Sequence, residues 1–116
     1  MPTETQQLAR AELEAEIQAA RNTRIETRDR VMHSLVNWPN LKIIVVAMPA
    51  EASWPQHSTT GRISVQVLHG RIRMKALDQW FELSPGQVLA LESSVPHDVE
   101  ALEDSEFLLT IAKCDG

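Results

Sequence analysis

The sequence predicts an all-β fold, an antiparallel sandwich or barrel, that follows a single N-terminal helix. Eight short runs of β-forming residues come at close, regular spacing after residue 24, with turn residues between them. No second helical pattern and no internal repeat interrupts this series. At 116 residues the chain has the length of one domain. We therefore expect residues 1–23 to form a helical arm and residues 24–116 to form the β-domain.

The predicted helix covers residues 3 to about 22. Thr3 and Gln6 have the spacing of a capping box, and neither Gly nor Pro interrupts the segment. Its apolar residues form a thin stripe at helical spacing, made of Ala9, Leu13, Ile17 and Ala20. Because the stripe is narrow, we expect the helix to dock on the barrel or on a partner subunit, with its acids and glutamines in solvent.

The predicted strands are recognised by runs of β-branched and apolar residues between turn residues. They cover residues 31–36, 41–48, 63–68, 71–76, 80–83, 87–91, 97–101 and 107–112. The first two form a hairpin around residues 37–40, and residues 49–55 are predicted as a loop. In two strands apolar and polar residues alternate, which places Ile63, Val65 and Val67 on one face and Ile72, Met74 and Ala76 on another.

Charge and composition exclude several classes of partner. Sixteen acidic against eleven basic residues give a net charge of -5, which disfavours nucleic acid and anionic lipid. Four arginines (Arg21, Arg24, Arg28 and Arg30) alternate with Glu26 and Asp29, so we interpret them as a solvated face. The longest apolar run, residues 43–48, is too short to cross a membrane. The single cysteine, Cys114, excludes an internal disulfide, and the first residues lack a secretory pattern, so we expect a cytoplasmic protein.

Four histidines are the candidates for chemistry, because neutral imidazole is a common metal ligand and proton carrier. His57 shares the interior phase of the strand that carries Ile63, and His97 shares that of Val99. Both are therefore expected to point into the barrel. His33 and His69 have no neighbouring ligand in sequence, and we expect a surface or edge role for them.

From residue 57 to residue 112 the chain resembles a small cupin of the cupin-2 type, a two-motif jelly-roll barrel. The first cupin motif is His, His, Glu and Gly at fixed spacing, and this chain has His57, Thr59, Ile63 and Gly70 at those positions. The second motif is Gly, Pro, Gly, His and Asn, and it is matched by Gly86 and His97 alone. The phrases VLHGRIRM and ELSPGQVLALESSVPHDVEA also carry the resemblance.

The resemblance implies a metal site of three His and one carboxylate, of which only His57 and His97 remain. Thr59 is a poor ligand and Ile63 cannot ligate, so the motifs are degenerate. Glu92, Asp98 and Glu100 would complete a site only if the strand departed from simple alternation. We therefore expect no cofactor, or a weakly bound divalent metal (Zn, Ni, Fe or Mn) on His57 and His97.

Two functions remain open. The first is binding or sensing of a small molecule in a metal-free cavity, because an apolar residue replaces the carboxylate at position 63. The ligand-binding residues would be His57, His97, Thr59, Ile63, Val65, Val67 and Met74, with Trp54 at the rim. Trp80 is a second rim candidate, although both tryptophans also suit a core or an interface. The second function is a metal-dependent enzyme of the oxygenase or isomerase type that uses His57 and His97. Cupin relatives commonly pair, so the resemblance also implies a homodimer.

Overall fold

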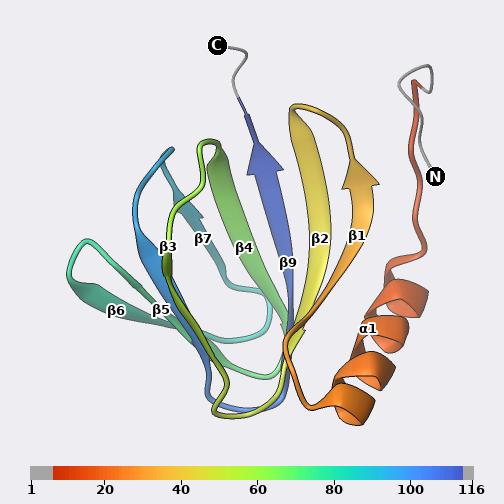
Figure 1. Cartoon of the computed structure of the whole chain (residues 1–116), viewed down its shortest axis with the longest axis horizontal. Coiled ribbons are helices and arrows are strands. Elements are labelled where there is room, and N and C mark those ends of the chain that lie inside the picture. The colour runs from red at the N-terminus through yellow and green to blue at the C-terminus, as the bar shows by residue number, and fades with distance from the viewer. Residues whose placement is uncertain (1–6, 114–116) are drawn as a thin grey trace.

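The computed structural model describes residues 7–113 and confirms the predicted all-β fold with one N-terminal helix (Figure 1). In chain order its elements are α1 (Leu13–Thr27), β1 (Val31–Asn37), β2 (Leu41–Met48), β3 (Ser53–His57), β4 (Arg62–His69), β5 (Ile72–Ala76), β6 (Gln79–Leu83), β7 (Val88–Leu91), β8 (His97–Ala101) and β9 (Ser105–Ala112). Thr3, Gln6 and Cys114 lie outside the described residues. No helix in residues 7–113 is long and apolar enough to span a membrane.

The strands form two antiparallel sheets that face each other. One sheet has the order β1-β2-β9-β4-β7 and the other has the order β3-β8-β5-β6. Figure 1 shows the larger sheet facing the smaller one, with α1 beside β1 and β2 on the outer side. Strands that are distant in sequence therefore become neighbours, and β9 lies between β2 and β4.

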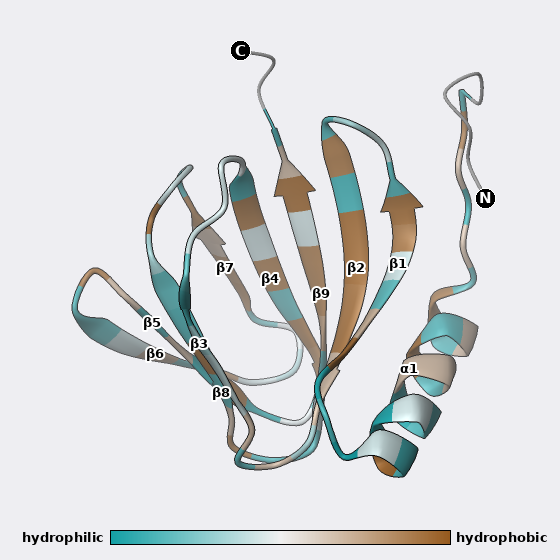
Figure 2. Ribbon diagram, viewed as in Figure 1, coloured by the Kyte–Doolittle hydropathy of each residue, from teal (hydrophilic) through white to brown (hydrophobic). Residues whose placement is uncertain are grey.

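The core between the sheets follows the predicted alternation. Ile63, Val65 and Val67 are each at most 4% exposed, while the residues between them are only half-buried. In β5, Ile72, Met74 and Ala76 are buried in the same way. Figure 2 shows apolar residues concentrated on β2, β4 and β9, which are neighbouring strands of the larger sheet. Burial on one face of each strand thus sets the register of the whole sandwich.

The helix occupies a later segment than predicted. Residues 7–12 are not helical, although the prediction includes them, so the described helix begins at Leu13. It ends at Thr27, past the predicted boundary at residues 23 and 24. Ile17 and Ala20 are buried against the outer face of β2, whereas Leu8 is 72% exposed. A short helix is marginal without such contacts, so the segment that reaches the sheet is the one that is helical. Arg28 ends the helix in a left-handed conformation, φ 59°, and its N–H donates to Arg24 O at 2.7 Å.

The predicted loop over residues 49–55 is wrong in its second half, because β3 begins at Ser53. This strand lies at the edge of its sheet and pairs only with β8, so Pro55 removes no hydrogen bond from a central ladder. Its register shifts between Trp54, which faces Val99, and His57, which faces His97. Sequence alternation alone does not detect a strand with a proline and a register shift.

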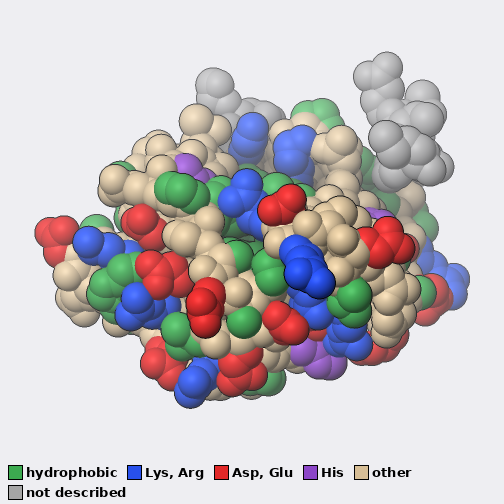
Figure 3. Space-filling view, turned by 60° about the horizontal axis from the view of Figure 1, so that its bottom comes forward, with side chains coloured by type: hydrophobic (Ala, Val, Ile, Leu, Met, Phe, Trp, Pro, Cys, Tyr) green, Lys and Arg blue, Asp and Glu red, His purple; other side chains and the backbone are tan. Residues whose placement is uncertain are grey.

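The prediction that all four arginines lie on a solvated face is also wrong. Arg24 is only 6% exposed and forms an ion pair with Glu106 of β9, which is 2% exposed. Arg21 donates to the same carboxylate at 2.8 Å. Elsewhere the charges are mixed, and Figure 3 shows acidic and basic side chains interspersed over the face in view.

Candidate functional site

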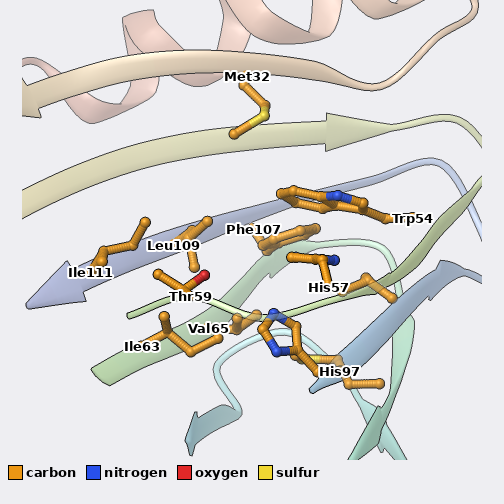
Figure 4. Close-up of a pocket in the computed structure, with 12 residues that line it drawn as sticks. Met32, Trp54, His57, Thr59, Ile63, Val65, His97, Phe107, Leu109 and Ile111 are labelled. Carbon is orange, nitrogen blue, oxygen red and sulfur yellow. The ribbon is translucent and has the colours of Figure 1, made fainter. Parts of the chain in front are cut away.

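A cavity of about 200 Å³ lies between the two sheets. Its walls come from both sheets and from the loop after β3, and most of its lining residues are apolar. They are Met32, Trp54, His57, Thr59, Ile63, Val65, Met74, His97, Val99, Phe107, Leu109 and Ile111. In Figure 4, Ile63, Leu109 and Ile111 lie on one side of the view, and Trp54 and His57 lie on the other.

Strand pairing explains how the aliphatic wall forms. Ile63 pairs with Ile111 and Val65 pairs with Leu109 across β4 and β9. Paired residues in antiparallel strands point to the same face of the sheet. The two strands therefore present one continuous aliphatic surface to the cavity.

Seven of the eight residues that the sequence predicts as ligand-binding line this cavity. The exception is Val67, which is 1% exposed in the core but lies outside the cavity lining. The sequence analysis did not select Met32, Val99, Phe107, Leu109 and Ile111. The three residues of β9 share one strand phase, which is a signal that the sequence contained. Met32 projects from an edge strand, is 48% exposed, and had no such signal.

His57 and His97 meet at the edge of the smaller sheet. They are opposite one another in the pairing of β3 with β8, and their ring centroids are 4.3 Å apart at an interplanar angle of 63°. His97 is 4% exposed, and His57 is half-buried. Figure 4 shows the His57 ring above the His97 ring, with one of the two His97 ring nitrogens directed toward His57. The structure thus places side by side two residues that are 40 positions apart in sequence.

Each histidine ring is held by the backbone carbonyl of the residue two positions before it. His57 Nδ1 lies 2.8 Å from Pro55 O, and His97 Nδ1 lies 2.9 Å from Val95 O. A carbonyl oxygen can only accept, so Nδ1 carries the proton and donates it in each case. In the neutral form of each ring, Nε2 is therefore a hydrogen-bond acceptor.

Burial holds His97 in this neutral form. Desolvation lowers the pKa of His97, and the nearby His57 lowers it further. The hydrogen bond to Val95 and the charge of Asp98 act in the opposite direction but do not outweigh burial. At neutral pH the His97 side chain is accordingly an uncharged acceptor.

Trp54 forms the aromatic wall beside the histidines. Its ring stacks on His57, with centroids 4.5 Å apart and an interplanar angle of 16°. The Arg30 guanidinium lies 4.3 Å from the centre of the same indole. Trp80, the other rim candidate, is instead exposed on β6, beside Arg73. Of the two candidate tryptophans, only Trp54 belongs to the cavity.

The donors in this cavity fit a tightly held metal ion poorly. A stable protein site normally supplies at least three ligands, and here His57 and His97 are the only strong ones. Within residues 7–113, no group of three or more His, Cys, Asp or Glu side chains is placed to share an ion. The three acids considered as substitutes lie elsewhere. Glu92 pairs with Arg62, Glu100 pairs with Arg73, and Asp98 lines a separate surface cleft.

The two remaining histidines lie away from the cavity. His33 Nε2 lies 2.6 Å from a carboxylate oxygen of Glu16, on the edge strand β1. His69 is exposed at the end of β4. Neither ring lines the space where His57 and His97 meet.

Solved structures of several proteins share the fold of this chain. An RmlC-like cupin protein from Desulfovibrio desulfuricans is 26% identical, with a TM-score of 0.68 over 96% of this chain and 97% of its own. A Streptococcus pyogenes protein of unknown function is 22% identical, with a TM-score of 0.72 over 78% of this chain and 79% of its own. A cupin 2 conserved barrel domain protein from Leptotrichia buccalis is 27% identical, with a TM-score of 0.71 over 75% of this chain and 42% of its own.

Comparison by sequence alone gives no further relative, since no protein-family model and no curated protein matches the chain. The assignment of the fold depends on the arrangement of the strands, and it agrees with the two motif remnants that meet in the cavity. The remnant of the first motif contributes His57 on β3, and that of the second contributes His97 on β8. The chain therefore has the jelly-roll fold of small cupin domains, with an N-terminal helix added to it.

Proposed function

We propose that this cupin domain binds a small, mostly apolar molecule in the cavity between its sheets, without a tightly held metal ion. One observation carries the proposal. The cavity is preformed, its walls are mainly aliphatic and aromatic, and its polar groups (His57, Thr59 and His97) are few. Pockets with apolar walls and a few convergent polar groups are typical of ligand sites.

The size of the cavity limits the ligand. An apolar cavity of about 150 Å³ is large enough to admit benzene. The present cavity, at about 200 Å³, suits a molecule slightly larger than one six-membered ring. Nucleotides and sugars linked to nucleotides are too large and too polar for it.

Ligand-induced shifts of methyl resonances test the proposal. Small apolar probes are expected to shift the methyl signals of Ile63, Leu109 and Ile111 and to raise the melting temperature. The variant Ile111→Trp places a large ring in the cavity and should abolish these effects. The matched control is Thr110→Trp, which adds the same bulk on the opposite face of β9 and should retain them. Equal binding by both variants would place the ligand outside the cavity.

A metal-dependent oxygenase or isomerase is the second candidate. The Nδ1 contacts favour it, because metal-bound histidines commonly donate their other ring N–H to a carbonyl, which leaves Nε2 free to ligate. Elemental analysis of protein purified without added metal separates the two functions. Stoichiometric Zn, Ni, Fe or Mn that is lost in His57→Ala or His97→Ala would favour the enzyme.

A further inference from the structure

The polar groups that face the cavity are mainly hydrogen-bond acceptors. In their neutral forms His57 and His97 both carry the ring proton on Nδ1, where it is donated to Pro55 O or Val95 O. Among the residues that line the cavity, only the Thr59 hydroxyl and the Trp54 indole N–H have a hydrogen to donate. No charged side chain within residues 7–113 lines the space, and Arg30 lies against Trp54 without being part of the lining.

Both Nε2 atoms remain accessible. Each makes no hydrogen bond to a residue in the described part of the chain. Trp38 Nε1 is the only fully buried side-chain nitrogen or oxygen in residues 7–113 without a partner. Neither Nε2 is therefore sealed from both solvent and the cavity.

This arrangement discriminates between ligand classes. A carboxylate would bring its own lone pairs against those of the imidazoles, with no cation in the wall to compensate. An ammonium group would be transferred into an apolar space without a carboxylate partner, which is costly. A neutral hydroxyl can donate to one Nε2 and keep its apolar body against the aliphatic wall.

On the basis of the proposed binding function, we infer that the ligand is a neutral alcohol or phenol whose hydroxyl donates to Nε2 of His97 or His57. The apolar body of the ligand lies against Ile63, Leu109 and Ile111. A ligand of the same shape without the hydroxyl leaves the imidazole acceptors unpaired. Selectivity therefore comes from the hydroxyl, and affinity comes mainly from the apolar wall.

Three probes of similar size test the inference on the intact protein: phenol, toluene and benzoate. Toluene is the most hydrophobic, so it binds tightest to a cavity that offers no hydrogen bond. We expect phenol to bind at least as tightly as toluene, and benzoate to bind at least about tenfold more weakly than phenol. Calorimetry or the methyl shifts described above measure all three affinities.

Replacement of the histidine that accepts the hydrogen bond should change the relative affinities of the probes. In one of the variants His97→Leu and His57→Leu, whichever removes the acceptor, the ratio of phenol to toluene affinity is expected to fall about tenfold, because only phenol loses a hydrogen bond. The control His69→Leu alters an exposed imidazole outside the cavity, and it should leave the ratio unchanged. If His97→Leu does not fold, the ring-nitrogen NMR signals of the unmodified protein decide the question. They should show the proton on Nδ1 of both rings, and phenol but not toluene should shift a signal from Nε2.

Two results would overturn the inference that the ligand carries a hydroxyl, while the proposal that the cavity binds a ligand would stand. One is tighter binding of toluene than of phenol, and the other is a proton on Nε2 of both rings. Failure of all three probes to bind contradicts the proposed function, and the inference fails with it.

Discussion

Arg24 of α1 and Glu106 of β9 form an ion pair in which both side chains are almost fully buried, at 6% and 2% exposure. The Arg24 guanidinium also donates to Ser105 O at 3.3 Å, and Arg21 donates to Glu106 at 2.8 Å. The pair joins the helix to the outer face of the larger sheet. On the inner face of the same strand, Phe107 lines the cavity. One strand thus holds the helix on one face and the candidate site on the other.

Loss of one partner in this pair should destabilise the protein strongly. Glu106→Gln leaves Arg24 buried without its counter-ion, so we expect the free energy of unfolding to fall by about 3 kcal/mol. Urea denaturation measures the change. The double variant Arg24→Met, Glu106→Leu removes both charges and should be less destabilised than Glu106→Gln.

The exposed pair of Arg62 and Glu92 provides the control. Both side chains are more than 60% exposed, so Glu92→Gln should change the unfolding midpoint little. Equal losses in Glu106→Gln and Glu92→Gln would contradict the role assigned to burial.

Two glycines with positive φ should respond differently to alanine. Gly86 has φ 89° and no atom near the position of an added Cβ, so Gly86→Ala should cost only backbone strain, about 1 kcal/mol. Gly70 has φ 83°, and an added Cβ would lie 2.3 Å from Asp104 O. We expect Gly70→Ala to cost about 3 kcal/mol, because overpacking adds to the strain. Thermal unfolding of both variants measures which one loses more stability. Equal losses would show that the clash between the added Cβ and Asp104 O does not matter.

Local periodicity was sufficient to predict the strands that are buried on one face. In β4 and β5 the side chains alternate between core and surface, and the sequence alternates with them. The same phase placed His97 in the interior, because a strand positions every second residue on one face. For His57 the argument was wrong, because His57 belongs to β3 and not to the strand that carries Ile63, although its ring does line the cavity. These features depend on neighbours in sequence and are visible without a structure.

Features that depend on distant partners were not predicted. Arg24 has a buried partner 82 positions away, and charge alternation around it gave no sign of that contact. The β3 strand escaped detection because Pro55 and a register shift conceal its pairing with β8. Met32 reaches the cavity from an edge strand whose residues show no clear burial pattern. Each of these required knowledge of which elements meet in space.

Acid should destabilise the protein partly through His97. Burial lowers the pKa of His97 in the folded state below the ordinary value of 6.5. The unfolded chain therefore takes up a proton first as the pH falls, and stability that is present above about pH 6.5 is lost as the pH falls through the folded pKa. Between about pH 7.5 and pH 5.5, the free energy of unfolding should fall less in His97→Gln than in the unmodified protein.

The matched control for this pH dependence is His69→Gln. Because His69 is exposed at the end of β4, its replacement should leave the slope of stability against pH unchanged. A slope that is equally steep in His97→Gln would assign the acid sensitivity to other groups. His57 and Asp98, which both act on His97, are the first to examine.

Restoration of the two missing ligands should create a metal site in this barrel. Thr59 and Ile63 line the same cavity as His57 and His97, at the positions where the resemblance implies a histidine and a glutamate. The double variant Thr59→His, Ile63→Glu would supply three imidazoles and one carboxylate, a donor set sufficient for Zn or Ni. Elemental analysis after dialysis should find about one metal ion per chain in the double variant and far less in the unmodified protein. A glutamate placed at position 63 without a metal would be buried and unpaired, so chelation should also lower the melting temperature of the double variant alone. About one metal ion per chain in both proteins would contradict the metal-free function, because it would mean that His57 and His97 suffice to hold the ion.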